Sequence, residues 1–401
     1  MWLLNRIENE LLKITASALF KTEYELKNDI DYSAVLDEAE AQVVYCLVYD
    51  KVSSVIPPDE AADRLENYYR HIILNVAVDD SHAEVHNLMT ENGIEYVTVK
   101  GCASASYYPE PELRCMGDVD FLVHPDNYSR AVQLAKEQGF KPNENDDESH
   151  HQALQKDLII WEIHHSLNGL PEGEIGELCK KKLSGIFDTA VIYKKGDKRF
   201  LMTDSYHHGL VMLFHLIEHI TTTGVGLRHI CDWAVFVGSM TEAEFVKMYE
   251  ADLKEIGLWQ FARILTALSS EYLGLPEREF AKGVDKNLLN DMIEDVIKGG
   301  NFGKKDKDRY HGSMLVADKN SEGEGVAKSF FKTLNRRVRY RMPITEKLPF
   351  LLPFGWIHVG LNHIKMVVKG ERPSLHPTKT IKEAAKRSDL NKRYRLFERI
   401  D

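Results

Sequence analysis

Cysteine is scarce in this sequence, and its distribution limits the kinds of protein that the chain can be. The chain has 401 residues and five cysteines, which are scattered and never form a C-x-x-C pair. An odd, dispersed set argues against a disulfide framework and against a zinc–thiolate site. The early Glu8 and Glu10 do not fit a signal peptide. We therefore expect a protein of the reducing cytoplasm.

Long hydrophobic runs are absent as well. The longest apolar segment, residues 348–364, is interrupted by Pro349 and Pro353. It is also shorter than the roughly 20 residues that a membrane-spanning helix needs. We therefore expect no transmembrane segment. We expect this segment to pack against the body of the protein, with contact to a membrane surface as the alternative.

Positive charge is sparse in most of the chain and concentrated at its end. Residues 301–401 hold 23 Lys and Arg against 11 Asp and Glu, whereas residues 1–300 hold 28 against 51. A basic region could meet the phosphates of a nucleic acid, a nucleotide or a membrane, or it could neutralise the acidic body. Nucleic acid stays open as a partner but is not favoured, because no aromatic stacking platform accompanies the basic residues.

Local patterns predict an α+β fold, with a small mixed-sheet core flanked by N-terminal helices and a larger C-terminal helical region. Four parts are expected: an N-terminal helical region (1–92), an α/β core with a following hairpin (93–202), a helical domain (203–300) and a basic C-terminal region with the apolar Pro-containing segment (301–401). The polar, Gly-rich stretch 299–325 predicts a linker or mobile loop.

Three strands are expected in the α/β core, because β-branched and aromatic residues gather there between turn signals. They cover residues 94–100, 118–123 and 158–165. Helices are expected between them at 101–108 and 127–139. A hairpin at 190–202, turning at Gly196-Asp197, completes this part of the chain.

Asp118 and Asp120 open the second of these strands. Because they are two residues apart, they share one face of the sheet, while the apolar run after them is suited to burial. Buried carboxylates are costly unless paired, and a divalent cation is a natural partner. Glu162, between Trp161 and Ile163, would supply a third carboxylate. Three carboxylates on adjacent strands can hold two Mg²⁺ ions, with Mn²⁺ as the alternative, for an in-line displacement at phosphorus.

Lys100 and Gly101 precede this acidic pair and suit a phosphate. A glycine lets the backbone approach closely, and the N-terminus of the following helix offers amide groups. Ser104 could add a hydroxyl. Arg114 could contact phosphate or pair with the aspartates. These residues form the expected phosphate-binding set.

These segments resemble the DNA polymerase β-like nucleotidyltransferase superfamily, and in particular its uncharacterised bacterial nucleotidyltransferase family. The resemblance is carried by Arg114 and by the motifs Val99-Lys-Gly101, Tyr107-Tyr-Pro109, Gly117-Asp-Val-Asp-Phe-Leu-Val123, Gly139-Phe140 and Trp161-Glu-Ile-His164. It implies that Asp118 and Asp120 are metal ligands and that Glu162 is the third acidic residue, which helps to position the nucleophile. The family's usual Gly-Ser pair is Gly101-Cys102 here, with the serine at position 104.

The resemblance implies a Mg²⁺-dependent enzyme that moves a nucleoside monophosphate from a nucleoside triphosphate such as ATP to an acceptor hydroxyl and releases pyrophosphate. Two alternatives remain: a catalytically inactive nucleotide-binding module of the same fold, and a metal-dependent glycosyltransferase, since Asp-x-Asp also occurs there. The absence of a long βαβ series counts against the second. The sequence does not indicate the acceptor, the preferred base or the oligomeric state.

Several pairs of histidines are candidate ligands for zinc. The pairs are His150-His151, His164-His165, His207-His208 and, at helical spacing, His215 and His219. No H-E-x-x-H motif and no evident third ligand accompany them, so zinc is not favoured. Arg228 and Asp232 stand four residues apart in an expected helix, which indicates an ion pair. The family resemblance implies instead that the helical domain packs across the cleft and that Arg228 is a nucleotide-binding residue.

Overall fold

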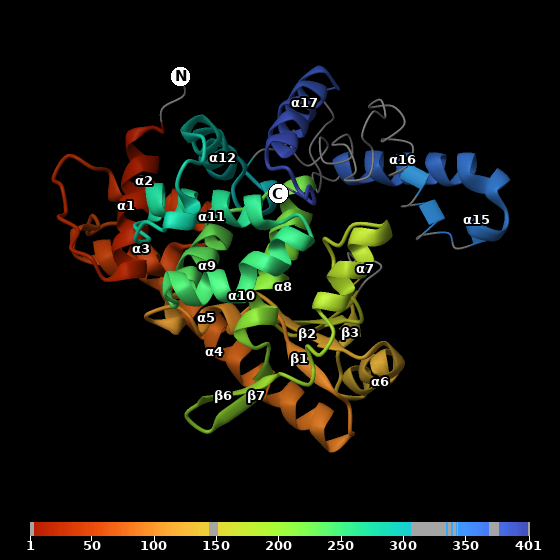
Figure 1. Ribbon diagram of the computed structural model, residues 1–401. Coiled ribbons are helices and arrows are strands. Elements are labelled where there is room, and N and C mark those ends of the chain that lie inside the picture. Colours follow the sequence, from red (N-terminus) through yellow and green to blue (C-terminus); the bar gives the residue numbers. More distant parts are fainter. Residues whose placement is uncertain are drawn as a thin grey trace.

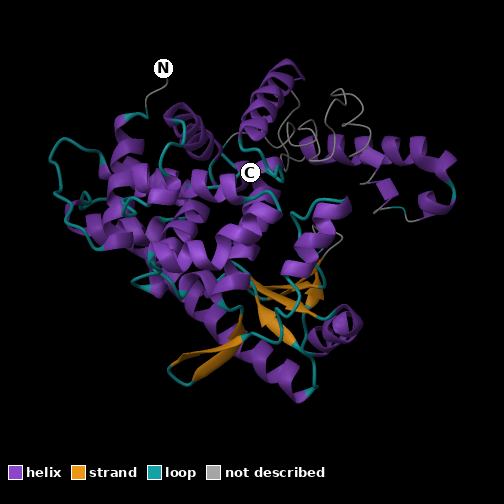
Figure 2. Cartoon of the chain, in the orientation of Figure 1, coloured by secondary structure: helices purple, strands orange, loops and turns teal. Residues whose placement is uncertain are grey.

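The computed structural model describes residues 4–143, 151–305, 334–335, 338–339, 342, 344–368 and 377–399. A seven-stranded mixed sheet lies at one end of the molecule, and helices from both halves of the chain pack together at the other (Figure 1). Figure 2 shows the strands gathered below the helical part, with one long helix running beneath the sheet. The predicted α+β class is confirmed.

The N-terminal region is helical, as the sequence predicts. Its helices are α1 (Arg6–Phe20), α2 (Tyr32–Ala41), α3 (Tyr45–Val52) and α4 (Ala61–Glu91). Asn5 caps α1 through a capping box with Glu8, and Asp31 caps α2. Helices α1 to α3 join the hydrophobic core of the later helices, while α4 packs under the sheet.

The sheet contains the three predicted strands, the predicted hairpin and two further strands. Its strands are β1 (Tyr96–Thr98), β2 (Val119–Val123), β3 (Lys141–Pro142), β4 (His151–Lys156), β5 (Ile159–His164), β6 (Val191–Lys195) and β7 (Lys198–Met202), in the order β3-β4-β5-β2-β1-β7-β6. Strand β2 is antiparallel to β1 and parallel to β5. The sequence does not predict β3 and β4, which lie on either side of the polar, acidic stretch 143–149 in the sequence.

The two faces of the sheet have opposite characters. Val119, Phe121 and Val123 of β2 pack with Trp161 of β5 against α4 and α6 (Tyr128–Glu137). The Trp161 indole donates a hydrogen bond to Ser81 of α4 (2.7 Å), which satisfies its buried N–H. Because side chains alternate along a strand, the acidic positions of β2 and β5 lie on the other face. That face is turned toward α8.

The C-terminal helices belong to the helical end of the molecule. They are α8 (Ser205–Thr221), α9 (Leu227–Gly238), α10 (Glu242–Glu255), α11 (Trp259–Leu273), α12 (Lys286–Gly299) and α17 (Pro377–Arg393), and the shorter α5 (Cys102–Ala105) and α7 (Gly173–Lys182) connect the core strands. The buried Gln42 side chain accepts from the backbone of Leu227 (3.0 Å) and donates to Ile297 (3.0 Å). It therefore fixes the start of α9 beside the end of α12.

The apolar Pro-containing segment forms α16 (Leu352–Val368), preceded by α15 (Ile344–Lys347). The helix extends away from the body (Figure 1), and four large apolar side chains of this segment are 61–68 % exposed: Phe350, Phe354, Ile357 and Leu361. The expectation that this segment packs against the body is wrong for these side chains. None of the helices in the described ranges combines the length and apolar character needed to cross a bilayer.

Candidate active site

Strand pairing brings the three predicted carboxylates together. In the parallel pair of β2 and β5, Asp120 stands opposite Glu162, and Asp118 lies one step before β2. One carboxylate oxygen from each residue lies within 4.8 Å of the other two. They line a cavity of about 320 Å³ between the sheet and helices α8 and α9. This volume is typical of a small-molecule site.

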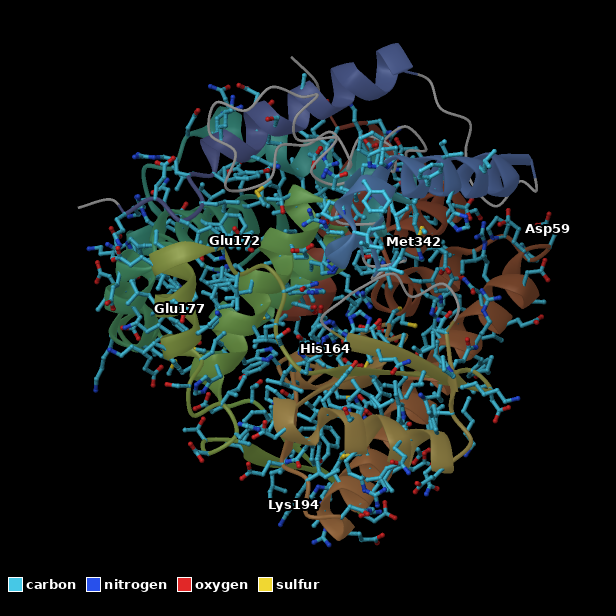
Figure 3. The ribbon with its side chains drawn as sticks, turned by 90° about the vertical axis from the view of Figure 1, so that its right-hand side faces the viewer. Asp59, His164, Glu172, Glu177, Lys194 and Met342 are labelled. Carbon is cyan, nitrogen blue, oxygen red and sulfur yellow. The ribbon has the colours of Figure 1, made fainter. Side chains whose placement is uncertain are left out.

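Asp120 is the most strongly paired of the three carboxylates. Its Oδ1 atom accepts from Lys100 Nζ at 2.6 Å and lies 2.9 Å from His164 Nε2. Burial alone would raise its pKa, but the charge of Lys100 and the hydrogen bond from His164 hold the pKa of Asp120 well below its usual range. Figure 3 places His164 in the interior, between the sheet and the helices. Asp120 is therefore ionised at neutral pH.

The negative charges of Asp118 and Glu162 are less well balanced by neighbouring positive charge. Burial, followed by the negative charge of Asp120, raises the pKa of both side chains, and that of Glu162 lies well above its usual range. Lys100 Nζ is 3.9 Å from Glu162, so within the described part of the chain Lys100 is the ammonium group that balances this cluster of three carboxylates. The excess negative charge and the all-oxygen donor set fit a hard divalent cation such as Mg²⁺.

Gly101 adopts a conformation that side chains disfavour, with φ +44° and ψ −109°. It turns the chain from β1 into α5 beside the carbonyl of Asp118. Helix α5 has only four residues, so its dipole is small. The Ser104 hydroxyl lies 3.4 Å from His208 Nε2 on α8, and burial lowers the pKa of His208 to about 4. Ser104 lines the cavity but its hydroxyl is directed to a neutral histidine.

Arg114 and Arg228 differ in their surroundings. The Arg114 guanidinium makes two 2.7 Å bonds to the Asp232 carboxylate, which also accepts from Tyr108 (2.7 Å). This pair is buried and joins the loop before β2 to α9. Asp232 therefore pairs with Arg114, in place of the i,i+4 partner that the helix spacing indicates. Arg228 donates to the carbonyl of Cys115 (3.1 Å) and lines the cavity.

The wall opposite the carboxylates is built from rings. His215 and His219 of α8, His229 of α9 and Phe302 line the same cavity. The Phe302 ring centroid lies 4.6 Å from that of His219 and 5.3 Å from that of His229. Burial lowers the pKa of all three histidines, that of His229 to about 3, so these imidazoles are uncharged at neutral pH.

Phe302 is held in place by backbone constraints. It adopts a left-handed conformation with φ +55° in a short turn at Asn301–Gly303. A side chain on Gly226 would come within 2.8 Å of the Asn301 backbone, so the glycine allows the turn to approach α9. The predicted linker therefore begins later than residue 299, and residues 306–325 lie outside the described ranges. The polar, Gly-rich sequence around Phe302 does not predict that its ring would line the site.

Comparison with known protein families identifies the family of this chain. No curated protein sequence matches the chain. A model of the uncharacterised nucleotidyltransferase family matches residues 28–274. This range includes the seven strands, the three carboxylates and the three histidines of the opposite wall. This match extends over more than half of the chain. The chain therefore belongs to the uncharacterised nucleotidyltransferase family.

Proposed function

We propose that this protein is a Mg²⁺-dependent nucleotidyltransferase that moves a nucleoside monophosphate from a nucleoside triphosphate to an acceptor hydroxyl. The observation that carries the proposal is the cluster of Asp118, Asp120 and Glu162 in the cavity beside Lys100. These carboxylates would hold two Mg²⁺ ions, which would neutralise charge on the triphosphate and on the leaving pyrophosphate. Mn²⁺ is the alternative ion.

Lys100 is proposed to exchange partners when the nucleotide arrives. Its ammonium group now balances Asp120 and Glu162. Once those carboxylates face a metal, the lysine charge is free to turn toward the phosphate oxygens. Arg228 lines the same cavity with its guanidinium on the opposite wall, and we propose it as a second phosphate contact.

Arg114 contributes indirectly in this scheme. Its bonds are directed to Asp232 and not to the acidic cluster. We propose that this ion pair positions the loop that leads into Asp118 and fixes it against α9. Ser104 is likewise proposed to orient α5 on His208, with Gly101 providing the close backbone approach to phosphate.

Glu162 is proposed to act on the acceptor. Burial and the negative charge of Asp120 raise the pKa of Glu162, which makes this carboxylate a stronger base than an ordinary glutamate. The acceptor oxygen would form a bond to the α-phosphorus as the bond from that phosphorus to the β-phosphate oxygen breaks. The hydroxyl proton would pass to Glu162 and pyrophosphate would leave.

The ring-lined wall is proposed to receive the nucleobase. Neutral imidazoles and the Phe302 ring offer stacking surfaces to any base, and they stand across the cavity from the carboxylates that would hold the phosphates.

The five cysteines are all free and buried, in keeping with the proposed cytoplasmic location.

Binding and turnover can be tested separately. Calorimetric titration of each of the four nucleoside triphosphates, with and without Mg²⁺, should show metal-dependent binding of at least one. Pyrophosphate release with a metabolite extract should then reveal turnover. Binding without turnover would leave an inactive nucleotide-binding module, and tighter binding of a sugar nucleotide than of any triphosphate would contradict the proposal.

A further inference from the structure

A second group of metal-binding side chains overlaps the carboxylate cluster. Strand β4 pairs with β5 in antiparallel register, which sets His151 directly opposite His164 and places both beside Glu162 on the same face of the sheet. One ligand atom from each of these three residues lies within 4.8 Å of the other two. The group therefore follows from strand register rather than from sequence proximity.

The distances between these ligand atoms suit a tetrahedral transition-metal ion. His164 Nε2 lies 3.6 Å from Glu162 Oε2, and His151 Nε2 lies 3.9 Å from Glu162 Oε1. Ligands about 2.0–2.1 Å from a tetrahedral Zn²⁺ are roughly 3.3–3.5 Å apart, so small side-chain rotations would close the site. Both histidine side chains are at least 93 % buried.

We propose that His151, Glu162 and His164 form a Zn²⁺ site. Two imidazoles and one carboxylate are a donor set typical of Zn²⁺ and of neighbouring transition metals, whereas Mg²⁺ prefers oxygen ligands. Asp120, whose Oδ1 lies 2.9 Å from His164 Nε2, is close enough to complete the coordination. The sequence contains these histidines but does not show that they meet.

The site shares Glu162 with the proposed Mg²⁺ cluster, so the two occupancies compete. A Zn²⁺ ion held by His151 and His164 would withdraw Glu162 from the acceptor side and place a positive charge next to Lys100. Zn²⁺ would therefore inhibit the proposed transfer reaction. The binding step itself does not depend on that reaction, since it requires only the geometry of β4 and β5.

Zn²⁺ titration of the metal-stripped full-length chain, without nucleotide, tests this site. The wild type should bind one Zn²⁺ in this site, and His151→Ala should weaken that binding at least about tenfold, as even the loss of an outer partner of a metal site does. Asp118→Asn should keep Zn²⁺ binding within about twofold while it weakens Mg²⁺ binding. His124→Ala, at a surface histidine whose side chain is 47 % exposed, is the matched control.

Equal Zn²⁺ affinity in His151→Ala and the wild type would overturn the proposal. So would an equal loss in Asp118→Asn and His151→Ala, because the ion would then sit on the carboxylates. The visible absorption spectrum of Co²⁺ bound to the wild type is a second test, and it does not depend on whether a variant folds. Strong visible absorption of a four-coordinate ion is expected, and the faint spectrum of an octahedral ion would contradict the site.

Discussion

Replacing Asp118 with asparagine should make the metal-free protein more stable while it removes the response to Mg²⁺. The three carboxylate oxygens lie within 4.8 Å of one another, and Lys100 is the ammonium group that faces them. The raised pKa of Asp118, caused by burial and by Asp120, indicates that its charge is unfavourable in the folded state. Asparagine keeps the shape and removes the charge.

The distance between the carboxylate oxygens gives the size of this gain in stability. Two unit charges 4.8 Å apart repel by about 3.5 kcal/mol at an effective dielectric constant of about 20. Solvent contact and the Lys100 charge offset part of this repulsion, so we expect a net gain of about 1–2 kcal/mol, the usual size of a stabilising substitution. Each kcal/mol corresponds to a rise in Tm of about 2–4 °C in domains of 150–250 residues.

Mg²⁺ should offset this difference in stability. At a free Mg²⁺ concentration ten times its Kd, binding stabilises the wild type by about 1.4 kcal/mol, and the variant should gain little. Thermal unfolding with and without Mg²⁺ measures both effects, with Asp59→Asn as the matched control at an exposed position far from the site (Figure 3). A variant less stable than the metal-free wild type, or one that Mg²⁺ stabilises equally, would refute the reasoning.

Three further predictions concern the other parts of the site. Asp232→Ala should destabilise the protein by about 3–5 kcal/mol in denaturant unfolding, because it leaves the Arg114 guanidinium buried without its partner; a loss below about 1 kcal/mol would contradict a supporting role for the pair. Phe302→Ala should weaken binding of Mg²⁺-nucleotide by about 1–3 kcal/mol, the usual value of one stacked base, and leave calorimetric binding of Mg²⁺-tripolyphosphate unchanged; equal losses for both would place the base elsewhere. The stabilisation by Mg²⁺ should shrink as the pH falls through the raised pKa values of Asp118 and Glu162, because protons then compete with the metal. A raised pKa in the folded state favours the protonated form, so the metal-free protein should lose stability as the pH rises through the same range. Melting curves measured at a series of pH values would contradict this assignment if the metal-free protein gained stability with rising pH.

The sequence predicts the parts of the site that depend on short-range patterns. Asp118 and Asp120 share a face because strands have a period of two, and Glu162 stands between apolar neighbours that must be buried. The expected strands, the hairpin and the helical wall are all present. Strand order is not predictable in this way, yet it is the parallel pairing of β2 with β5 that places Glu162 beside Asp120.

The parts that the sequence does not predict depend on long-range contacts. Arg114 and Asp232 are 118 positions apart, and no periodic pattern connects them. Strand β4 follows the polar, acidic stretch 143–149 of the sequence, so His151 has no strand signal of its own. Phe302 enters the site through a left-handed turn within a stretch whose composition is typical of a linker.

The most direct test of the proposed function is binding and turnover of Mg²⁺-nucleotide by the Asp118→Asn/Asp120→Asn double variant. The measurement combines calorimetric titration of the nucleotide that the wild type prefers with pyrophosphate release in a metabolite extract. We predict Mg²⁺-dependent binding and release in the wild type, and loss of release with at least about tenfold weaker binding in the variant. A folded double variant that binds and turns over the nucleotide as the wild type does would contradict the account.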